Sequence, residues 1–320
     1  MSNSDADYNV LVLGNIRPEG IEALKLFAHV TVLPEPVTKA DVLECVTHMD
    51  AILHKVGKVG QEIIDQQPKL QIIARHGVGL DDLDLPVIDA AGIPVSTTLN
   101  ANTNAVAEAT IGLVLSLLRH INSGEKMIKR EHKWSRETLM GREIKGSTVG
   151  IVGYGRIGRL VAQYYAVFGA NIIIYDAFPK SLKDCAFETV EFDQLLKNSD
   201  IVSLHCPLMQ ETHHLINAER LDLMKKNSIL VNTSRGGLVD KVALAKAAQA
   251  GQIAGAAIDV FDVEPPNFGD ALFACETILT TPHIAAMTLE AQTAMAVGAA
   301  EEIRHVLVDN AGPSNNVFDK

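Results

Sequence analysis

Cysteine and aromatic residues are scarce in this chain of 320 residues. It holds four cysteines and one tryptophan, and aromatic residues make up 5% of the sequence. The cysteines lie far apart, without a CxxC pair or a neighbouring histidine cluster at metal-ligand spacing; they are Cys45, Cys185, Cys206 and Cys275. Structural zinc sites need such spacing, so we predict no bound metal. Scattered cysteines in a chain of this size are typical of reduced thiols, which favours a cytoplasmic protein.

The sequence also lacks long apolar runs and an excess of positive charge. No uninterrupted apolar run approaches the ~18 residues that a membrane span needs, and the chain begins with polar and acidic residues. The formal net charge of -11 and the pI near 5.4 argue against nucleic acid or an anionic membrane surface as a partner. A local basic site for an acidic small molecule remains compatible with this charge.

Hydrophobic residues are abundant, at 47% of the chain, and short apolar segments alternate with helical stretches. Length and composition suffice for two domains, each with its own core. One series of predicted strands covers residues 9–13, 30–33, 51–53, 70–74 and 94–96. A second series covers residues 149–152, 172–175, 201–204, 229–232, 256–260 and 278–279. This alternation is typical of α/β folds, so we predict two parallel-sheet domains.

The domain boundaries follow from two long predicted helices. One covers residues 105–119, after a polar, turn-like segment, and the other covers residues 289–307 and would return the chain to the first sheet. We therefore predict a discontinuous domain of residues 1–100 and 288–320 and a second domain of residues 101–287. The charged stretch 129–142, which contains Trp134, has no clean periodicity. It is interpreted either as an arm that embraces a second subunit or as a solvated loop.

A glycine-rich turn lies at the start of the second series. Gly153, Gly155 and Gly158 follow the apolar run Thr148–Val152, and apolar residues recur at helical spacing from Ile157 onward. In this position the first glycine permits a tight turn and the second lets the backbone approach a pyrophosphate. The third lets helix pack on strand, and the N-terminal amides of the helix face the anion. The order of these elements predicts a dinucleotide site.

An acidic residue follows the next predicted strand at the spacing that a dinucleotide site requires. Asn171–Tyr175 forms this strand, and Asp176 comes eighteen positions after Gly158. A carboxylate here can bind the 2′-hydroxyl of a ribose and repels a 2′-phosphate. The sequence therefore favours NAD over NADP as cofactor.

Four further polar residues lie at or after the carboxyl ends of predicted strands of the second series: Arg235, Asp259, Glu264 and His283. Because the carboxyl ends of parallel strands line one crevice, we expect them to converge on whatever the cofactor faces. Hydride transfer from a hydroxyl carbon needs a group that carries the hydroxyl proton, and His283 suits that role. Glu264 would orient and charge its imidazole, and Arg235 would hold a substrate carboxylate. A strand-end ion pair, a turn cap and a structural histidine are the alternative readings of Arg235, Glu264 and His283.

Several motifs in this order make the chain resemble the D-isomer-specific 2-hydroxyacid dehydrogenases. They are GYGRIG from Gly153, HCPL from His205, THHLIN from Thr212, NTSRGGLVD from Asn232, AIDVFDVEPP from Ala257 and TPHIA from Thr281. The resemblance extends over about residues 72–286. It implies two doubly wound parallel-sheet domains, namely a Rossmann NAD-binding domain at 101–287 and a flavodoxin-like substrate domain formed by the flanking segments. It also implies an active site in the cleft and a homodimer.

The resemblance assigns roles to individual residues. It implies catalytic roles for Arg235, Glu264 and His283, and substrate binding by Arg235, by His283 and by the backbone amides of Val78 and Gly79. The predicted NAD site already contains Gly153, Gly155, Gly158 and Asp176. The resemblance adds further residues from the matching motifs to this site: Arg156, Ile157, Cys206, Pro207, Thr212, Thr233, Ser234, Arg235, Asp259, His283 and Ala285.

The choice of substrate is expected to depend on the loop at residues 53–58. Phosphoglycerate dehydrogenases of the family usually carry an Arg-Ser pattern where this chain has His54-Lys55. Lys55 is predicted to contact a second anionic group of the substrate, although a solvated lysine is an equal alternative, and solvation is the commoner fate for Lys58. Candidate substrates are 3-phosphoglycerate, hydroxypyruvate and glyoxylate. We expect no C-terminal regulatory domain, and the alternative function is an NAD(H)-sensing binding protein of the corepressor type.

Overall fold

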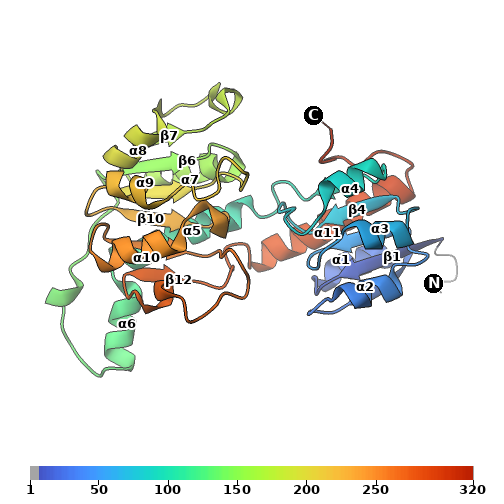
Figure 1. The fold of residues 1–320 in the computed structure, drawn as a ribbon, viewed down its shortest axis with the longest axis horizontal. Coiled ribbons are helices and arrows are strands. Elements are labelled where there is room, and N and C mark those ends of the chain that lie inside the picture. Colours follow the sequence, from blue (N-terminus) through green and yellow to red (C-terminus); the bar gives the residue numbers. More distant parts are fainter. Residues whose placement is uncertain (1–6, 320) are drawn as a thin grey trace. The chain divides into compact units, whose positions relative to one another are not determined.

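The computed structural model describes residues 7–319, which form two compact units. Unit 1 comprises the described residues up to Asn102 and from Met287 onward, and unit 2 comprises Thr103–Ala286 (Figure 1). Within the described residues, no helix is both long and apolar enough to cross a membrane. Each unit has its own parallel sheet, with helices on both faces, as the sequence predicts.

Unit 1 is built on five parallel strands in the order β2-β1-β3-β4-β5. The strands are β1 (Tyr8–Leu13), β2 (Ala28–Leu33), β3 (Ala51–His54), β4 (Ile72–Arg75) and β5 (Val95–Thr97). The helices are α1 (Pro18–Lys25), α2 (Lys39–Cys45), α3 (Gln61–Gln66), α4 (Leu85–Ala90) and α11 (Leu289–Leu307). The strand order is that of flavodoxin-like sheets, in which ligands bind at the carboxyl ends of the strands.

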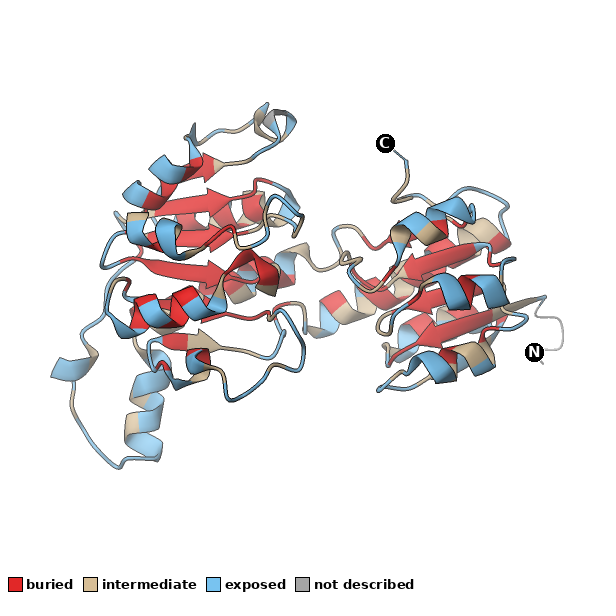
Figure 2. Cartoon of the chain, in the orientation of Figure 1, coloured by how far each residue is buried: buried red, intermediate tan, exposed pale blue. Residues whose placement is uncertain are grey.

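Alternating side chains of the strands supply two apolar cores to unit 1. Val10 and Val12 point to the face covered by α1 and α11, whereas Leu11 and Leu13 point to the face covered by α2, α3 and α4. The strand interiors are therefore buried on both sides, as parallel sheets require. Figure 2 shows the central strands of both units in the buried colour and the outer helix faces in the exposed colour.

Unit 2 contains seven parallel strands in the order β12-β11-β10-β9-β6-β7-β8. The strands are β6 (Thr148–Val152), β7 (Asn171–Tyr175), β8 (Glu188–Thr189), β9 (Ile201–Leu204), β10 (Ile229–Asn232), β11 (Gly255–Ile258) and β12 (Ile278–Thr280). One face carries α5 (Thr103–Leu118) and α7 (Arg156–Val167), and the other carries α8 (Phe192–Asn198), α9 (Ala218–Leu223) and α10 (Lys241–Gln249). The strand order reverses between β6 and β9, which makes the carboxyl ends of these two strands the expected ligand crevice.

Two elements of unit 2 were not expected from the sequence. The edge strand β8 has two exposed residues and therefore gives no apolar signal. The helix α6 (Ile121–Lys129) has only exposed or half-buried residues, so no core contact marks it in the sequence. It is followed by an irregular segment with a short 3-10 helix, η1 (Glu137–Leu139). In Figure 1, α6 and this segment extend away from the sheet of unit 2.

Candidate active site

The glycine-rich turn joins β6 to α7 with the geometry of an anion site. Gly153 has φ +94°, and a β-carbon there would lie 2.7 Å from the backbone nitrogen of Cys206, while a β-carbon on Gly158 would overlap the Gly153 carbonyl oxygen. A β-carbon on Gly155, in contrast, would meet no atom within 4 Å. The open space therefore lies where a pyrophosphate would approach the backbone.

The first turn of α7 supplies the donors for such an anion. Gly155 is the N-cap residue, without a side-chain capping bond, and Arg156 and Ile157 follow as the first helical residues. The first N–H groups of a helix have no intrahelical acceptor, and the helix dipole favours negative charge at this end. The residues present thus fit a dinucleotide pyrophosphate.

Asp176 follows β7 and turns its carboxylate back onto the glycine-rich turn. One carboxylate oxygen accepts the Tyr154 N–H at 2.7 Å, and the other accepts the Phe178 N–H at 2.8 Å. These bonds fix the side chain while the carboxylate keeps further acceptor sites, since each oxygen has two lone pairs. The fixed carboxylate fits the 2′-hydroxyl of a ribose.

Residues from the HCPL, THHLIN and NTSRGG motifs form a hydrogen-bonded wall near this turn. Ser234 donates to the Cys206 carbonyl oxygen at 2.7 Å, and the Thr212 hydroxyl accepts the Met209 N–H at 2.7 Å and donates to the Pro207 carbonyl at 2.8 Å. Burial is the main cause that raises the pKa of the Cys206 thiol to about 11, and the Asp176 charge adds to it. Cys206 is therefore a neutral thiol at the edge of the turn.

Thr233, which follows β10, is buried, and its side chain contacts the helix α5. Its hydroxyl is 2.9 Å from that of Thr110 on α5, which already donates its hydrogen to the Val106 carbonyl at 2.8 Å. Thr233 is consequently the donor in this pair. The bond ties the end of β10 to α5, a contact that the sequence did not reveal.

His283 and Glu264 form a close pair at the ends of neighbouring strands. The Nδ1 atom of His283 lies 2.7 Å from Oε2 of Glu264, and Oε1 of Glu264 accepts the Phe261 N–H at 3.0 Å. The hydrogen bond to Glu264 raises the pKa of His283 above its usual value. Burial alone would raise the pKa of Glu264, but the bonds from His283 and Phe261 hold it below its usual value.

The loop that carries His283 is anchored by Asp259. This carboxylate is fully buried and accepts the Thr281 hydroxyl at 2.6 Å and the N–H groups of Ile284 and Ala285, each at 2.9 Å. The His283 N–H also donates to the Asp259 carbonyl at 2.8 Å, and His283 has φ +53°. Asp259 thus determines where the imidazole points, in addition to its negative charge near the ring.

Arg235 follows β10 and lies within electrostatic range of the pair. Its positive charge lowers the pKa of both His283 and Glu264. The Nη1 atom of its guanidinium donates to the Ser234 carbonyl at 2.7 Å, and the side-chain amide of Asn232 donates to the Arg235 carbonyl at 2.8 Å. Unit 2 therefore brings together Arg235, Glu264 and His283, which are up to 48 positions apart in sequence (283 minus 235).

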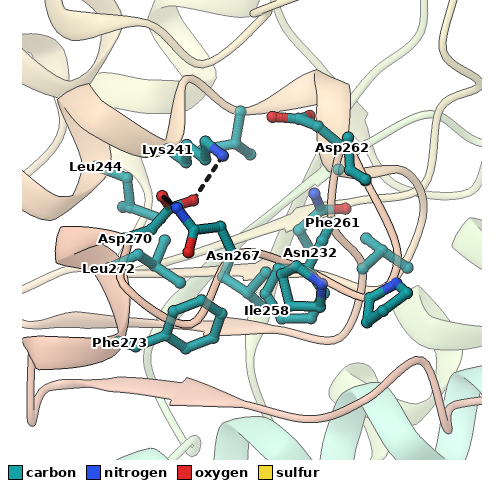
Figure 3. Close-up of a pocket in the computed structure, with 16 residues that line it drawn as sticks. Asn232, Lys241, Leu244, Ile258, Phe261, Asp262, Asn267, Asp270, Leu272 and Phe273 are labelled. Atoms are coloured by element: carbon teal, nitrogen blue, oxygen red, sulfur yellow. Dashed lines mark hydrogen bonds and ion pairs between the residues drawn. The ribbon is translucent and has the colours of Figure 1, made fainter.

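The segment that carries Glu264 also lines a mostly apolar cavity of about 380 Å³. Lys241 and Asp270 form an ion pair of 2.6 Å there, and Figure 3 shows it across the opening from Phe261 and Ile258. The described residues that line this cavity include Pro265 but not the adjacent Glu264. The Glu264 segment therefore borders open space on this side, and Glu264 itself is bonded to Phe261 and His283.

In unit 1, the loop after β4 presents backbone amides at the carboxyl edge of the sheet. Gly77 has φ +113°, its N–H donates to the Thr98 hydroxyl at 2.8 Å, and the Thr98 N–H donates to its carbonyl at 3.1 Å. The next two residues, Val78 and Gly79, are half-buried, and no described residue accepts a hydrogen bond from their N–H groups. Neighbouring free N–H groups of this kind can bind an anion.

The loop after β3 is occupied by internal contacts. Lys55 pairs with Glu35 at 2.8 Å, and the buried His54 lies 2.6 Å from the Gly57 carbonyl and 2.8 Å from the Arg75 guanidinium. Lys58 is exposed. Lys55, predicted to contact substrate, thus has an acidic partner that lies 20 positions away and that the sequence did not single out.

Comparison with known proteins agrees with this geometry. A family model described as the NAD binding domain of D-isomer specific 2-hydroxyacid dehydrogenases matches residues 111–285, more than half of the chain. The chain belongs to this family. As a D-isomer specific 2-hydroxyacid dehydrogenase, it is an NAD-dependent oxidoreductase of small 2-hydroxy acids, which confirms the expectation from the motifs.

Relatives of this dehydrogenase include reductases of small 2-keto acids. It is 40% identical to a glyoxylate reductase of Thermofilum pendens, over 87% of this chain and 84% of the relative. It is 37% identical to a hydroxypyruvate reductase of Thermotoga maritima, over 93% of this chain and 98% of the relative. The structure of a glyoxylate reductase from Paecilomyes thermophila is 30% identical, with a TM-score of 0.87 and coverage of 98% and 99%.

Proposed function

We propose that this dehydrogenase interconverts a small 2-hydroxy acid and the corresponding 2-keto acid, with His283 as the proton-transferring residue. Glyoxylate, hydroxypyruvate and 3-phosphoglycerate with its keto form are the candidate substrates, since relatives of 37–40% identity include glyoxylate reductases, a hydroxypyruvate reductase and D-3-phosphoglycerate dehydrogenases. The observation that carries the proposal is the 2.7 Å contact of His283 with Glu264, at a strand end of the NAD-binding unit. That contact converts a half-exposed histidine into an oriented acid-base group.

The nucleotide is assigned to the β6–α7 turn and the strand ends beside it. The N–H groups at the start of α7 would hold the pyrophosphate, Asp176 the ribose, and Cys206, Pro207, Thr212, Thr233, Ser234, Asp259 and Ala285 the walls of the site. Bound NADH would supply the hydride that reduces the keto carbon. A carboxylate at position 176, rather than a cation, supports NAD over NADP.

Proton transfer is assigned to Nε2 of His283. Its Nδ1 faces Glu264, so the hydrogen on Nδ1 is donated to that carboxylate and Nε2 is the nitrogen presented to substrate. In the reductive direction the protonated imidazole gives its Nε2 proton to the substrate oxygen. In the oxidative direction the neutral imidazole accepts it. The raised pKa of His283 keeps more of the ring protonated near neutral pH.

Substrate orientation is assigned to Arg235 and to the loop after β4. The guanidinium of Arg235 offers paired donors to a carboxylate and stabilises negative charge that develops on the reacting oxygen. The N–H groups of Val78 and Gly79 would bind the substrate carboxylate as an anion nest. Both assignments use groups whose charge or donors complement a 2-keto acid.

The oligomer is proposed to be a homodimer of a cytoplasmic enzyme. The segment after α6 exposes Trp134 and Met140, which are 80% and 82% accessible. Large apolar side chains on a protruding segment are typical of a contact surface, so this observation supports the interpretation as an arm rather than as a solvated loop. The four unpaired cysteines support a reducing compartment.

A spectrophotometric assay of NADH oxidation tests the proposed chemistry. Purified protein is offered glyoxylate, hydroxypyruvate and phosphohydroxypyruvate, and His283→Ala is compared with the wild type. We expect kcat to fall ~100-fold or more while the Kd for NADH stays nearly constant, because a general acid acts on the chemical step. His29→Ala, which removes an exposed histidine of β2, serves as the matched control. Equal turnover by His283→Ala and the control would remove His283 from the mechanism.

A further inference from the structure

Three loops of unit 1 converge on the ammonium group of Lys55. Its Nζ lies 2.8 Å from Oε1 of Glu35, which follows β2, and 2.7 Å from the carbonyl oxygen of Asn15, which follows β1. The Asn15 N–H in turn donates to the same Glu35 oxygen at 3.2 Å. Lys55 itself follows β3, and these three strands are adjacent in the sheet. The lysine is therefore held in a specific geometry at the carboxyl edge.

Gly14 makes room for this arrangement. It has φ +100°, and a β-carbon there would lie 3.2 Å from Oε1 of Glu35, 3.3 Å from the β-carbon of Lys55 and 2.9 Å from a methyl carbon of Val56. Any side chain at this position would press on both partners. The backbone of the loop after β1 thus leaves room for the Lys55–Glu35 ion pair. This distinguishes the ion pair from an incidental surface contact.

The loop that carries Lys55 is adjacent to the loop whose amides are assigned to the substrate carboxylate. Strand β3 pairs with β4, with His54 opposite Arg75, and the His76 N–H donates to the His54 carbonyl at 2.9 Å. The charge of Lys55 also reaches the ring of His76, two residues before Val78. Lys55 is accordingly a cation at the substrate edge of unit 1, and its charge is matched by Glu35.

The basic side chains at the ends of β3 and β4 are neutral or turned inward. Burial is the main cause that lowers the pKa of His54 to about 3 and that of His76 to about 4, so both rings are uncharged. The Nη1 atom of Arg75 donates to Nδ1 of His54 at 2.8 Å and to the Lys55 carbonyl at 2.5 Å. A second anionic group on a substrate would therefore have to compete with Glu35 for Lys55.

We propose that Glu35 is a specificity-determining residue, which holds Lys55 and thereby favours 2-keto acids whose remaining substituent is uncharged. The inference rests on the proposed function and narrows its substrate class to monoanions such as glyoxylate and hydroxypyruvate. A phosphate, sulfonate or second carboxylate would meet the Glu35 charge before it could gain the lysine. Repulsion between the Glu35 carboxylate and this second anionic group disfavours binding, and it disappears only when one of the two charges is removed.

The test compares kcat/KM for phosphohydroxypyruvate with kcat/KM for hydroxypyruvate, which differ by the phosphate. In the wild type we expect hydroxypyruvate to be preferred. In Glu35→Gln the ratio should shift by about tenfold toward phosphohydroxypyruvate, because one unit of positive charge is no longer neutralised. Glutamine keeps an acceptor for the Asn15 N–H, and a thermal melt checks that the variant is folded.

Two controls separate charge at this site from charge in general. Glu62→Gln breaks the exposed ion pair between Lys39 of α2 and Glu62 of α3, whose atoms are 2.7 Å apart. It changes the net charge by as much as Glu35→Gln does, and it should leave the ratio of the two kcat/KM values unchanged. In Glu35→Gln with Lys55→Met, the gain for phosphohydroxypyruvate should disappear, because the freed cation is gone.

The possible outcomes distinguish the two proposals. A wild type that prefers phosphohydroxypyruvate overturns the inference, even if Glu35→Gln proves unstable, and so does a folded Glu35→Gln variant with an unchanged ratio. In both cases the proposed function stands, because turnover is observed. Absence of turnover on either substrate in the wild type would overturn the proposed function and this inference with it.

Discussion

At the scale of single residues, the protonation of His283, the proposed acid-base group, depends on a competition among neighbouring charges. Glu264 and, more weakly, Asp259 raise the pKa of His283, whereas burial and the Arg235 charge lower it. The side chains of His283 and Glu264 are 49% and 39% accessible, so solvent screens the pair and its contribution to folding is small. In the proposed mechanism, the pair therefore matters for the protonation state of His283 rather than for stability.

Glu264→Gln is expected to shift the pH dependence of the reduction. In the proposed mechanism the reductive direction needs protonated His283, and without the carboxylate the pKa of His283 falls toward its ordinary value. The alkaline limit of kcat/KM for keto-acid reduction should therefore move to lower pH, with little change at pH values where the ring is protonated in both proteins. A pH profile measures the shift, with Glu276→Gln, at an exposed ion pair of unit 2, as the control. Superimposable profiles would contradict the assigned role of Glu264.

The sequence permits some residue contacts to be predicted and conceals others. The convergence of Arg235, Glu264 and His283 could be predicted, because residues after parallel strands share one edge of a sheet. The Lys55–Glu35 pair could not, since it joins two loops whose approach depends on the missing side chain of Gly14. The anchoring of the His283 loop by Asp259 was equally hidden, because a buried carboxylate leaves no periodic signal in the sequence.

At the scale of elements, the β6–turn–α7 unit separates the needs of folding from those of cofactor binding. Gly158 lies against the Gly153 carbonyl, so it is required for helix and strand to pack, whereas Gly155 faces open space with φ −75°. The role of Gly158 is therefore structural, whereas the open space at Gly155 is the proposed place of the pyrophosphate. Sequence alone assigns all three glycines to one motif and does not distinguish these roles.

Substitution by alanine should reveal this division. We expect Gly155→Ala to melt within about 1 kcal/mol of the wild type but to bind NADH at least ~10-fold more weakly, because the methyl group enters the space reserved for pyrophosphate. Gly158→Ala should lose about 3 kcal/mol of stability or more, since its β-carbon overlaps a backbone oxygen. Thermal melts and NADH titrations measure both effects. A Gly155→Ala protein with wild-type NADH affinity would argue against the assigned pyrophosphate position.

Element positions were predictable wherever apolar residues mark them. Strands β9 and β10 and the helix α11 have the predicted bounds, because each forms an apolar run or stripe against a core. The predicted strand at residues 256–260 ends earlier, at Ile258, because Asp259 turns its carboxylate to the neighbouring loop. The helix α6 remained undetected because its apolar side chains Ile121 and Ile128 are exposed and contribute to no core within unit 2.

At the scale of the whole molecule, three histidines are held neutral inside the fold. Burial is the main cause that lowers the pKa of His54 and His205 to about 3 and that of His76 to about 4. An unfolded chain binds protons on these rings near pH 6.5, so between that value and the folded pKa values the unfolded state carries more protons. Stability must therefore fall as the pH is lowered from about 6.5. His283 has the opposite sign, because its raised pKa contributes stability below about pH 6.5 that is lost as the pH rises through its folded pKa.

The acid sensitivity of folding can be assigned to individual rings by substitution. His54→Gln keeps a donor for the Gly57 carbonyl and an acceptor for Arg75 but cannot be protonated. Any loss of stability through imperfect fit is the same at all pH values, so the decline between about pH 6.5 and pH 5 should be shallower than that of the wild type, by up to about 1.4 kcal/mol per pH unit. Urea unfolding at a series of pH values measures the slope, and the exposed His29→Gln should retain the wild-type slope. Parallel slopes for His54→Gln and the wild type would mean that His54 is already protonated in the folded protein, against the burial that the structure gives it.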